Sequence, residues 1–300
     1  MDCPECRSSY TVKNGKKERS YSTFQSYYCN SCGTYFTDKE FQNKSYSANV
    51  ILQALKLYNQ GFTLKETSKH VNKRFGVNTS TSTIYNWYNE YKALCGYRAE
   101  LNNSDNIKDQ VVFEKVFEHN GLDYRFMYHK QKLNRAEDYF PNLTDFISNV
   151  KSECPNHLFN SENALRSSQT ETQEEFEVKE FRNNACELAD LGLKAVNNRR
   201  KRHDKVQDLM LKTDKATVAT ELPVWYYNKD LEDTVTGHID ILQTRNNRIH
   251  VLDYKPNAEK VEPVSQLRNY VKALSYRTGV LEDKFKAAWF NEKVYREIRF

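Results

Sequence analysis

Hydrophobic residues recur at helical spacing in three successive runs over residues 46–95. The first run stops at Gly61, a residue that commonly ends helices. The second opens on Thr63, three residues before Glu66, which is the spacing of a capping box. The third follows Ser80, a favourable N-cap. Three short helices joined by glycine-containing turns predict a helix-turn-helix unit.

The third of these helices would enter the major groove of DNA if the unit binds as helix-turn-helix proteins do. Polar residues at and near its N-terminus would then lie at the edges of the bases. These residues are Thr81, Ser82, Thr83, Tyr85, Asn86 and Asn89. The alternative is a plain three-helix bundle, in which Trp87 and the tyrosines of this helix serve only as core.

The C-terminal third reads as a mixture of strands and helices. One helix is expected from Glu174 to about His203, and another over Ser265–Tyr276. Between them lie three strand-like runs, the last two joined by a hairpin turn at Asn246-Asn247. A final hairpin is expected around Asn291-Glu292-Lys293. The strand-like runs are Ala219–Tyr227, Val235–Gln243 and Arg248–Lys255.

Residues 96–174 carry the weakest pattern. A strand is expected near Gly121–His129 and an amphipathic helix over Asn142–Val150, whereas residues 160–174 read as a linker or an exposed loop. The whole pattern predicts an α+β chain of several domains. These are a metal-binding domain at 1–40, a helical domain at 46–95, a connecting region of uncertain fold at 96–174, and an α/β domain with a central mixed sheet at 175–300.

Composition excludes two classes of protein. Hydrophobic residues make up 38% of the 300 residues, and no window approaches the roughly 18 uninterrupted apolar residues of a membrane-spanning helix. The 16 Phe and 20 Tyr argue against a disordered chain, because disordered segments are poor in aromatic residues. The N-terminus shows no apolar segment of the signal-peptide type. We therefore expect a cytoplasmic protein with no membrane partner, and its oligomeric state stays open.

The net charge of +5 is unevenly distributed. Residues 1–100 carry 14 Lys and Arg against 8 Asp and Glu, whereas the other 200 residues carry 31 against 32. All of the excess positive charge therefore lies in the first third, as expected of a module that binds nucleic acid. Such a surplus is also common on solvated surfaces, so charge alone decides nothing.

Four of the seven cysteines form two Cys-x2-Cys pairs, Cys3/Cys6 and Cys29/Cys32. In a cytosolic chain, such pairs indicate a metal site rather than disulfides. Two pairs, joined by a hairpin with a turn expected at residues 13–16, complete a tetrahedral shell around Zn²⁺. Four thiolates can also hold an iron–sulfur cluster, but turn-borne pairs favour a closed structural zinc site.

Two acidic residues and a lysine fall on neighbouring predicted strands. Strand alternation places Asp253 and Lys255 on one face, and the preceding hairpin can bring Asp240 beside Asp253. Two adjacent carboxylates repel each other unless a hard cation such as Mg²⁺ neutralises them. The lysine could orient an attacking water or stabilise charge on a phosphate. The alternative is an ordinary sheet with an Asp–Lys surface pair.

Two resemblances concern the first third of the chain. The CPxC motif, the NGK turn, and Gly33 followed by Phe36 after the second cysteine pair resemble the N-terminal zinc ribbon of insertion-sequence transposases. Residues 46–95 look like the helix-turn-helix that follows such ribbons. These resemblances imply DNA binding and a source in a mobile element, a plasmid or a virus.

Three ordered motifs stand in the C-terminal domain. GHIDIL, which contains Asp240, matches a GxhDxh pattern, and LDYK, which contains Asp253 and Lys255, matches (D/E)xK. Gln266 and Tyr270 match QxxxY and share one helix face. Together the motifs resemble the PD-(D/E)XK nuclease superfamily, and within it the RecB-like exonuclease group. The resemblance implies Mg²⁺- or Mn²⁺-dependent cleavage of DNA.

The resemblance also implies a role for each motif residue. Asp240 and Asp253 would be metal ligands, Lys255 the catalytic lysine, and Gln266 and Tyr270 residues that position the substrate.

Three further positions bear on the resemblance. Glu221 sits where the group often carries a strand-borne acid, and is expected as a third catalytic acid. The group often has a metal-binding histidine on the preceding helix, and Glu187 is the acid best placed to substitute for it. No cysteine follows Cys186, so the iron–sulfur cluster of some members is not expected.

A DNA-binding regulator with a catalytically idle nuclease fold is the competing class, and the intact Asp/Asp/Lys set argues against it. A transposase proper would need a ribonuclease-H-type Asp/Asp/Glu set across a long domain, which the middle region lacks. The sequence leaves open the polarity of cleavage, exo- versus endonuclease action, and any activity on RNA.

Overall fold

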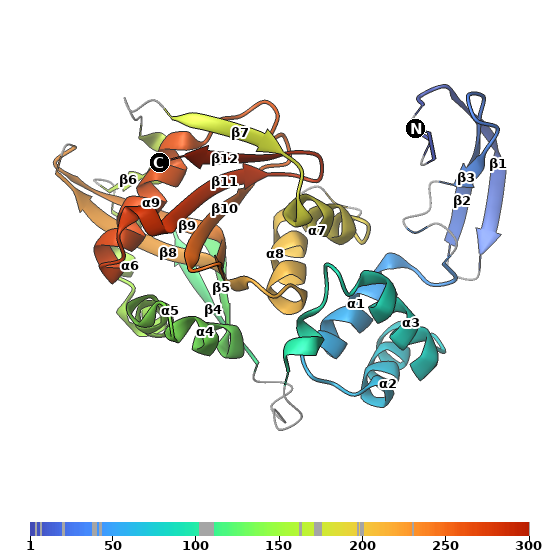
Figure 1. Cartoon of the computed structure of the whole chain (residues 1–300), viewed down its shortest axis with the longest axis horizontal. Coiled ribbons are helices and arrows are strands. Elements are labelled where there is room, and N and C mark those ends of the chain that lie inside the picture. Colours follow the sequence, from blue (N-terminus) through green and yellow to red (C-terminus); the bar gives the residue numbers. More distant parts are fainter. Residues whose placement is uncertain are drawn as a thin grey trace.

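The computed structural model describes residues 1–3, 5–6, 8–19, 22–37, 41, 44–101, 111–161, 164–170, 176–196, 198, 201–229 and 231–299. Parts of the predicted loop at 160–174, of the helix predicted from 174 and of the final hairpin fall outside these residues. A small N-terminal sheet, a three-helix unit and a large mixed sheet with helices on both faces follow one another along the chain (Figure 1). The predicted α+β class is confirmed.

The N-terminal sheet is antiparallel, in the order β1 (Thr11–Arg19), β2 (Ser22–Cys29) and β3 (Tyr35–Thr37). The turn predicted at residues 13–16 is wrong, because these residues lie within β1. Pairing with β2 shifts register between Lys13 and Lys16. Gly15 has φ +71° at this shift, a conformation that glycine adopts without steric cost. The glycine therefore serves a bulge rather than a hairpin.

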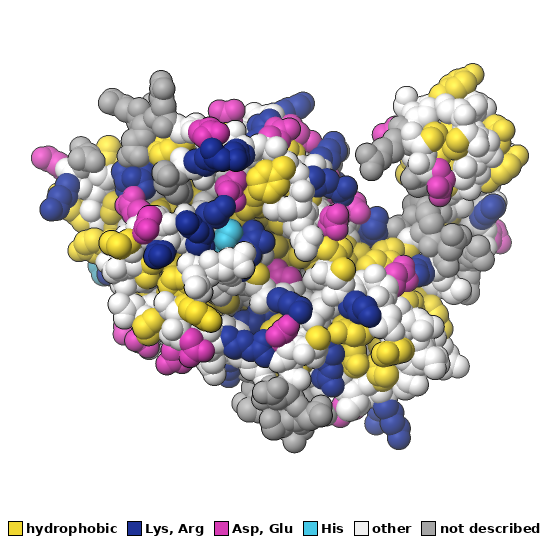
Figure 2. Space-filling model, in the orientation of Figure 1, with side chains coloured by type: hydrophobic (Ala, Val, Ile, Leu, Met, Phe, Trp, Pro, Cys, Tyr) yellow, Lys and Arg dark blue, Asp and Glu magenta, His cyan; other side chains and the backbone are white. Residues whose placement is uncertain are grey.

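This small sheet has very little apolar core. Cys3, Cys29 and Phe36 are buried together, with Tyr27 packed against them. Other apolar side chains are exposed on the module (Figure 2), including Tyr35 at 62%. A module of this size with so small a core requires a further source of stability, such as a bound metal.

The three predicted helices of residues 46–95 are confirmed as α1 (Ala48–Asn59), α2 (Leu64–Phe75) and α3 (Thr81–Tyr91). The capping box of α2 is complete, since Thr63 Oγ1 accepts from Glu66 N and the Glu66 carboxylate accepts from Thr63 N. Gly76 ends α2 at φ +63°. Ser80 Oγ caps α3 by accepting from Thr83 N.

The large sheet has nine strands, in the order β4-β5-β8-β9-β10-β11-β12-β7, with β6 beside β9. It is mixed, because β10 pairs with β11 and β6 with β9 in parallel, whereas the other pairs are antiparallel. The strands are β4 (Val112–His119), β5 (Leu122–His129), β6 (Leu165–Arg166), β7 (Glu177–Phe181), β8 (Thr217–Asn228), β9 (Asp233–Arg245), β10 (Arg248–Tyr254), β11 (Phe285–Phe290) and β12 (Tyr295–Arg299).

Helices cover both faces of the large sheet. The apolar sides of α5 and α9 pack into one core, and those of α7 and α8 pack into a second core on the other face. The helices of this part are α4 (Lys130–Glu137), α5 (Pro141–Glu153), α6 (Asn156–Phe159), α7 (Asn184–Leu193), α8 (Arg202–Thr213) and α9 (Val264–Thr278), with short 3-10 turns η1 (Tyr97–Glu100), η2 (Ser167–Gln169) and η4 (Glu282–Lys284).

Two parts of the C-terminal two thirds differ from the sequence prediction. Residues 96–174, for which the sequence predicts a connecting region, supply β4, β5 and β6 to the large sheet and α4 and α5 beside it. The single helix predicted from 174 to 203 is instead the edge strand β7, then α7, then the start of α8. β7 has every residue exposed, so it carries no apolar alternation that could reveal a strand.

The three-helix unit and the large sheet share one hydrophobic core. Ile51 of α1 belongs to the same buried cluster as Met210 of α8 and Leu252 of β10. Lys56 of α1 also donates to Asp208 of α8 at 2.8 Å, in an ion pair that is mostly buried. The inner side of α1 is therefore occupied, and α2 and α3 lie on the side away from the sheet (Figure 1).

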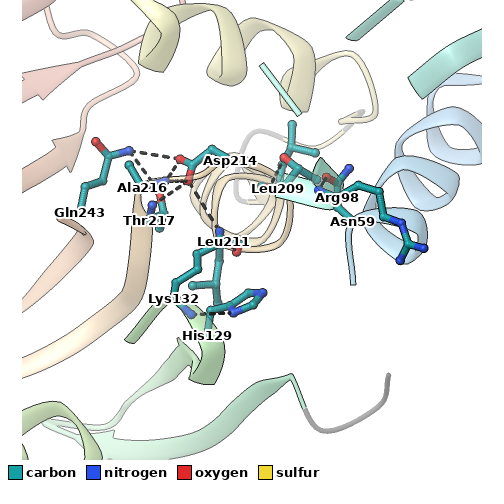
Figure 3. Close-up of polar contacts among 11 residues, drawn as sticks. Asn59, Arg98, His129, Lys132, Leu209, Leu211, Asp214, Ala216, Thr217 and Gln243 are labelled. Atoms are coloured by element: carbon teal, nitrogen blue, oxygen red, sulfur yellow. Dashed lines mark hydrogen bonds and ion pairs between the residues drawn. The ribbon is translucent and has the colours of Figure 1, made fainter. Parts of the chain in front are cut away.

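A buried polar network reinforces the same junction (Figure 3). Lys132 of α4 donates to the Leu211 carbonyl at 2.7 Å, and its Nζ lies 3.7 Å from Asp214 Oδ1. The Lys132 ammonium also lies over the ring of Tyr97, just beyond the three-helix unit. Asp214 accepts in addition from Thr217 N at 2.6 Å. Burial outweighs the attraction of Asp214 and lowers the pKa of Lys132 to about 8.

We expect Asp214→Ala to lower the free energy of unfolding more than Lys132→Met. The first change leaves a buried ammonium without its counter-ion, which costs about 3–5 kcal/mol. In the second, Asp214 keeps its backbone donors, and the loss should be about 1–2 kcal/mol. Denaturant unfolding measures both, with the exposed Asp145→Ala on α5 as the control. Equal effects for the two variants would contradict this account of the junction.

Candidate functional site

The four N-terminal cysteines converge on one point. Cys3 and Cys32 have their sulfurs 3.6 Å apart, as do Cys6 and Cys29. All four sulfurs lie within 4.8 Å of one another. Zinc–sulfur bonds of about 2.3 Å in a tetrahedron require sulfur separations of about 3.8 Å, so the cluster fits Zn²⁺ closely. Within the described residues, no other group of three or more Cys, His, Asp or Glu ligand atoms is gathered as tightly.

The register of the large sheet aligns three acidic residues on adjacent strands. On β8 and β9, Thr220 pairs with Ile241 and Leu222 with Ile239. Glu221 is therefore opposite Asp240.

The other side of β9 continues the row. Leu252 of β10 pairs with Ile241, and the next step along both strands sets Asp253 opposite Asp240. Glu221, Asp240 and Asp253 thus form a row across three strands that are about 4.8 Å apart.

The ladder between β9 and β10 ends one residue before the two aspartates. Leu252 and Ile241 are the last pair, and Asp240 Oδ2 then accepts from Tyr254 N at 2.9 Å. His203 Nδ1, at the start of α8, lies 3.4 Å from the same carboxylate oxygen. Asp253 has a cation of its own, because Lys255 Nζ lies 2.8 Å from its Oδ2.

Glu221 sits in a strained backbone position. Its φ is +49°, which is uncommon for a residue other than glycine and marks sites where the surrounding structure fixes the chain. Gln207 Nε2 of α8 donates to its carboxylate at 2.5 Å. This conformation redirects the Glu221 side chain within a strand whose other residues are buried as far as Tyr226.

Burial and proximity shift the proton affinities of the row. Burial, with the Asp240 charge added, raises the pKa of Asp253 to about 7 and that of Glu221 to about 8. Burial alone would also raise the pKa of Asp240, but the hydrogen bond and charge of His203 outweigh it, and the net pKa is lowered. For His203, burial is outweighed in turn by Asp240, and the pKa is raised. Three acids held this close can all ionise only beside a cation.

A cavity of about 610 Å³ opens onto Asp240 and Glu221. Its walls come from β5, β9, η2, the start of α8 and α9. Gly237 makes this packing feasible, because a Cβ there would lie 2.5 Å from both Ser167 Oγ and Tyr270 Cε1. Gln266 Nε2 donates to Tyr270 Oη at 2.7 Å, so these two residues act as a linked pair on the cavity wall.

The structure brings most of the predicted residues of the C-terminal site together, and one lies elsewhere. Glu187 is exposed on α7 and does not line the cavity. His203 and Gln207 lie there instead, and sequence reasoning missed both. His203 follows the basic run Arg199-Arg200-Lys201-Arg202 at the end of the helix predicted from Glu174, and no motif in the sequence distinguishes it there.

On α3, the predicted base-contacting residues divide by exposure. Thr81, Ser82, Tyr85 and Asn86 are exposed along one side, whereas Thr83 and Asn89 are half-buried. The Thr83 hydroxyl lies 2.9 Å from Ser80 Oγ in the helix cap.

The chain matches no protein-family model, no curated protein and no solved structure. Among the helices of the described residues, none is long and apolar enough to cross a membrane.

Replacing one cysteine should release the N-terminal metal. Cys29→Ser removes a buried ligand from a module with almost no other core, so the bound zinc should be lost and the module should unfold. Elemental analysis of purified protein measures the zinc content, with Cys154→Ser as the matched control. A wild-type protein without zinc, or full zinc content in Cys29→Ser, would contradict the assignment.

Without added divalent cations, the zinc-loaded protein should lose stability as the pH rises. Asp253 and Glu221 have pKa values of about 7 and about 8 when folded, against about 4 when unfolded. Between about pH 4 and pH 8 the folded state thus binds more protons than the unfolded state. The free energy of unfolding therefore falls as the pH rises through this range.

Asp253→Asn removes one of these acids and should stabilise the protein at pH 8 by up to about 4 kcal/mol. At pH 5 the gain should be small, because Asp253 is then protonated in the folded wild type. Thermal unfolding at both pH values, with the exposed Asp283→Asn as control, measures the difference. A gain at pH 5 equal to that at pH 8 would refute it.

Proposed function

We propose that this protein is a metal-dependent DNA nuclease. The observation that carries the proposal is the row formed by Glu221, Asp240 and Asp253, with Lys255 beside Asp253. Glu221 and Asp240 of this row line a cavity. Burying three acids in a row is costly for a purely structural sheet. The arrangement is chemically reasonable when a divalent cation and a phosphate complete it.

Each residue of the row has a role in this proposal. Asp240 and Asp253 would hold Mg²⁺ or Mn²⁺, and Glu221 would be the third acid. The bound cation would neutralise phosphate charge and acidify a coordinated water. Lys255, whose ammonium already contacts Asp253, would orient the water or stabilise the charge that builds on the phosphate. Gln266 and Tyr270 would position the DNA strand.

The first third of the chain would hold DNA. Its helix α3 exposes a polar side that could read base edges, and α2 beside it exposes cations that could contact phosphates. The N-terminal module with its zinc would add a second contact. The exposed cations of α2 are Lys65, Lys69, Lys73 and Arg74.

The test is cleavage of linear and circular DNA with and without Mg²⁺ or Mn²⁺. Asp240→Asn and Asp253→Asn keep the side-chain shape but weaken metal binding, so cleavage should collapse at ordinary metal concentrations. Lys255→Met should retain metal and DNA binding and lose about 100-fold or more in rate, the scale of one preorganised contact. Asp283→Asn and Lys293→Met, both exposed, are the matched controls.

The same assay separates the competing function. A folded wild-type protein that binds DNA but cleaves neither substrate with either metal would be a DNA-binding regulator with an idle nuclease fold. Cleavage at the wild-type rate by both Asp240→Asn and Lys255→Met would show that this centre is not the nuclease site.

A further inference from the structure

One wall of the cavity is a stack of aromatic rings that the proposed chemistry does not use. Tyr124 of β5 lies flat against His238 of β9, with ring centroids 3.6 Å apart and planes 5° from parallel. Both residues line the cavity. His238 is two residues before Asp240 on the same strand, so the two side chains share a face about 7 Å apart. The stack therefore stands directly beside the row of acids.

His238 is fixed in place from behind. The Asn156 amide oxygen accepts from His119 Nε2 at 2.9 Å, so His119 Nδ1 accepts from His238 Nε2, also at 2.9 Å. The His119 ring itself stacks on Phe159 at 4.2 Å. Two elements besides its own strand, β4 and α6, thus hold the His238 ring in place behind Tyr124.

Tyr124 is placed to contact a ligand in the cavity rather than to fill the hydrophobic core. It is half-buried, and the apolar cluster of this side of the sheet contains its neighbours Phe117 and Phe126 but not Tyr124 itself. Burial raises the pKa of Tyr124, and the charges of Glu221 and Asp240 add to the rise against the opposing effect of Arg166. The tyrosine therefore lies within electrostatic reach of the acids that would bind metal and of a cation on the cavity wall.

We propose that Tyr124, backed by His238, is a stacking platform for the nucleobase next to the scissile phosphate. This inference rests on the proposed nuclease function and adds a binding subsite to it. Every nucleobase has a π face, so stacking on a rigid aromatic ring gives affinity with little sequence preference. It would also fix the adjacent phosphate relative to Asp240 and the other acids. A base stacked there is outside a duplex, so the nucleotide beside the cut has to be unpaired.

The direct test measures binding in a protein that cannot cut. In an Asp240→Asn background, a short single-stranded oligonucleotide is titrated by fluorescence anisotropy, and Tyr124→Ala should weaken its affinity roughly ten- to a hundredfold. Tyr124→Phe and Tyr124→Trp should restore binding, because both keep a stacking ring. Tyr227→Ala, which removes a tyrosine that is 54% exposed at the end of β8, is the matched control and should change nothing.

A second arm identifies the stacked base. A single abasic nucleotide is placed at each position of the oligonucleotide in turn. At one position it should weaken binding to the Asp240→Asn protein by about the same factor as Tyr124→Ala does. In the double variant Asp240→Asn/Tyr124→Ala, the abasic nucleotide at that position should weaken binding no further, because both partners of the contact are then absent. In wild-type protein with Mg²⁺, Tyr124→Ala should raise KM more than it lowers kcat.

Two results would overturn the proposal. If Tyr124→Ala binds the oligonucleotide as tightly as the Asp240→Asn parent does, Tyr124 is not a stacking platform, even if the wild type cleaves DNA. Additive losses at every abasic position would mean that Tyr124 contacts something other than a base. Failure of the nuclease proposal looks different, because the wild type would then bind oligonucleotides through Tyr124 without cutting them.

Discussion

The candidate active site depends on one event in the sheet, the separation of β9 from β10 directly after the pair Ile241–Leu252. The backbone N–H of Tyr254 loses its ladder partner at this point, and the Asp240 carboxylate accepts from it instead. This hydrogen bond takes the place of a backbone pair between the two strands, so it fixes the direction of the Asp240 side chain. Asp253 is then the next residue on the neighbouring strand, and the acids meet because the ladder ends there. A one-residue slip in the register of β9 against β10 would turn these side chains to opposite faces.

The elements around this point determine what can reach it. The β4–β5 hairpin and α6 close one side of the cavity, and α9 approaches on another side because Gly237 has no side chain. The three-helix unit is joined to the same sheet through α8, by a shared core and by the buried Lys56–Asp208 ion pair. The exposed side of α3 and the row of acids are therefore parts of one packed body. In a nuclease built this way, the distance between the DNA held by α3 and the bond cut at Asp240 would be fixed by the fold.

Local signals made much of this fold predictable. The helices of residues 46–95 follow from contacts between near neighbours, such as the Thr63–Glu66 capping box and the left-handed Gly76. β9 and β10 follow from alternation and from Asn246-Asn247, whose positive φ values suit a tight hairpin. The proximity of Asp240, Asp253 and Lys255 was predictable for the same reason, since strand and turn geometry fixes their spacing.

Features that depend on distant partners were missed. β4 and β7 gain their place from pairing across the sheet, and a polar edge strand carries little pattern of its own. Glu187 and His203 lie on successive helices, and only the packing of α8 on the sheet selects His203. Gly15 shows that a local signal can also give a wrong prediction. Its Asn-Gly sequence is a strong hairpin signal, yet here it serves a bulge because β1 continues to Arg19.

The central claim is that the row of acids is a divalent-metal site, and Mn²⁺ binding followed by electron paramagnetic resonance tests it most directly. Zinc-loaded protein near pH 8 should bind Mn²⁺, and Mg²⁺ should compete for the same site. Asp240→Asn should abolish this binding while the protein stays folded and keeps its zinc. Wild-type protein that leaves Mn²⁺ free at millimolar concentration, or equal binding by Asp240→Asn, would contradict the claim.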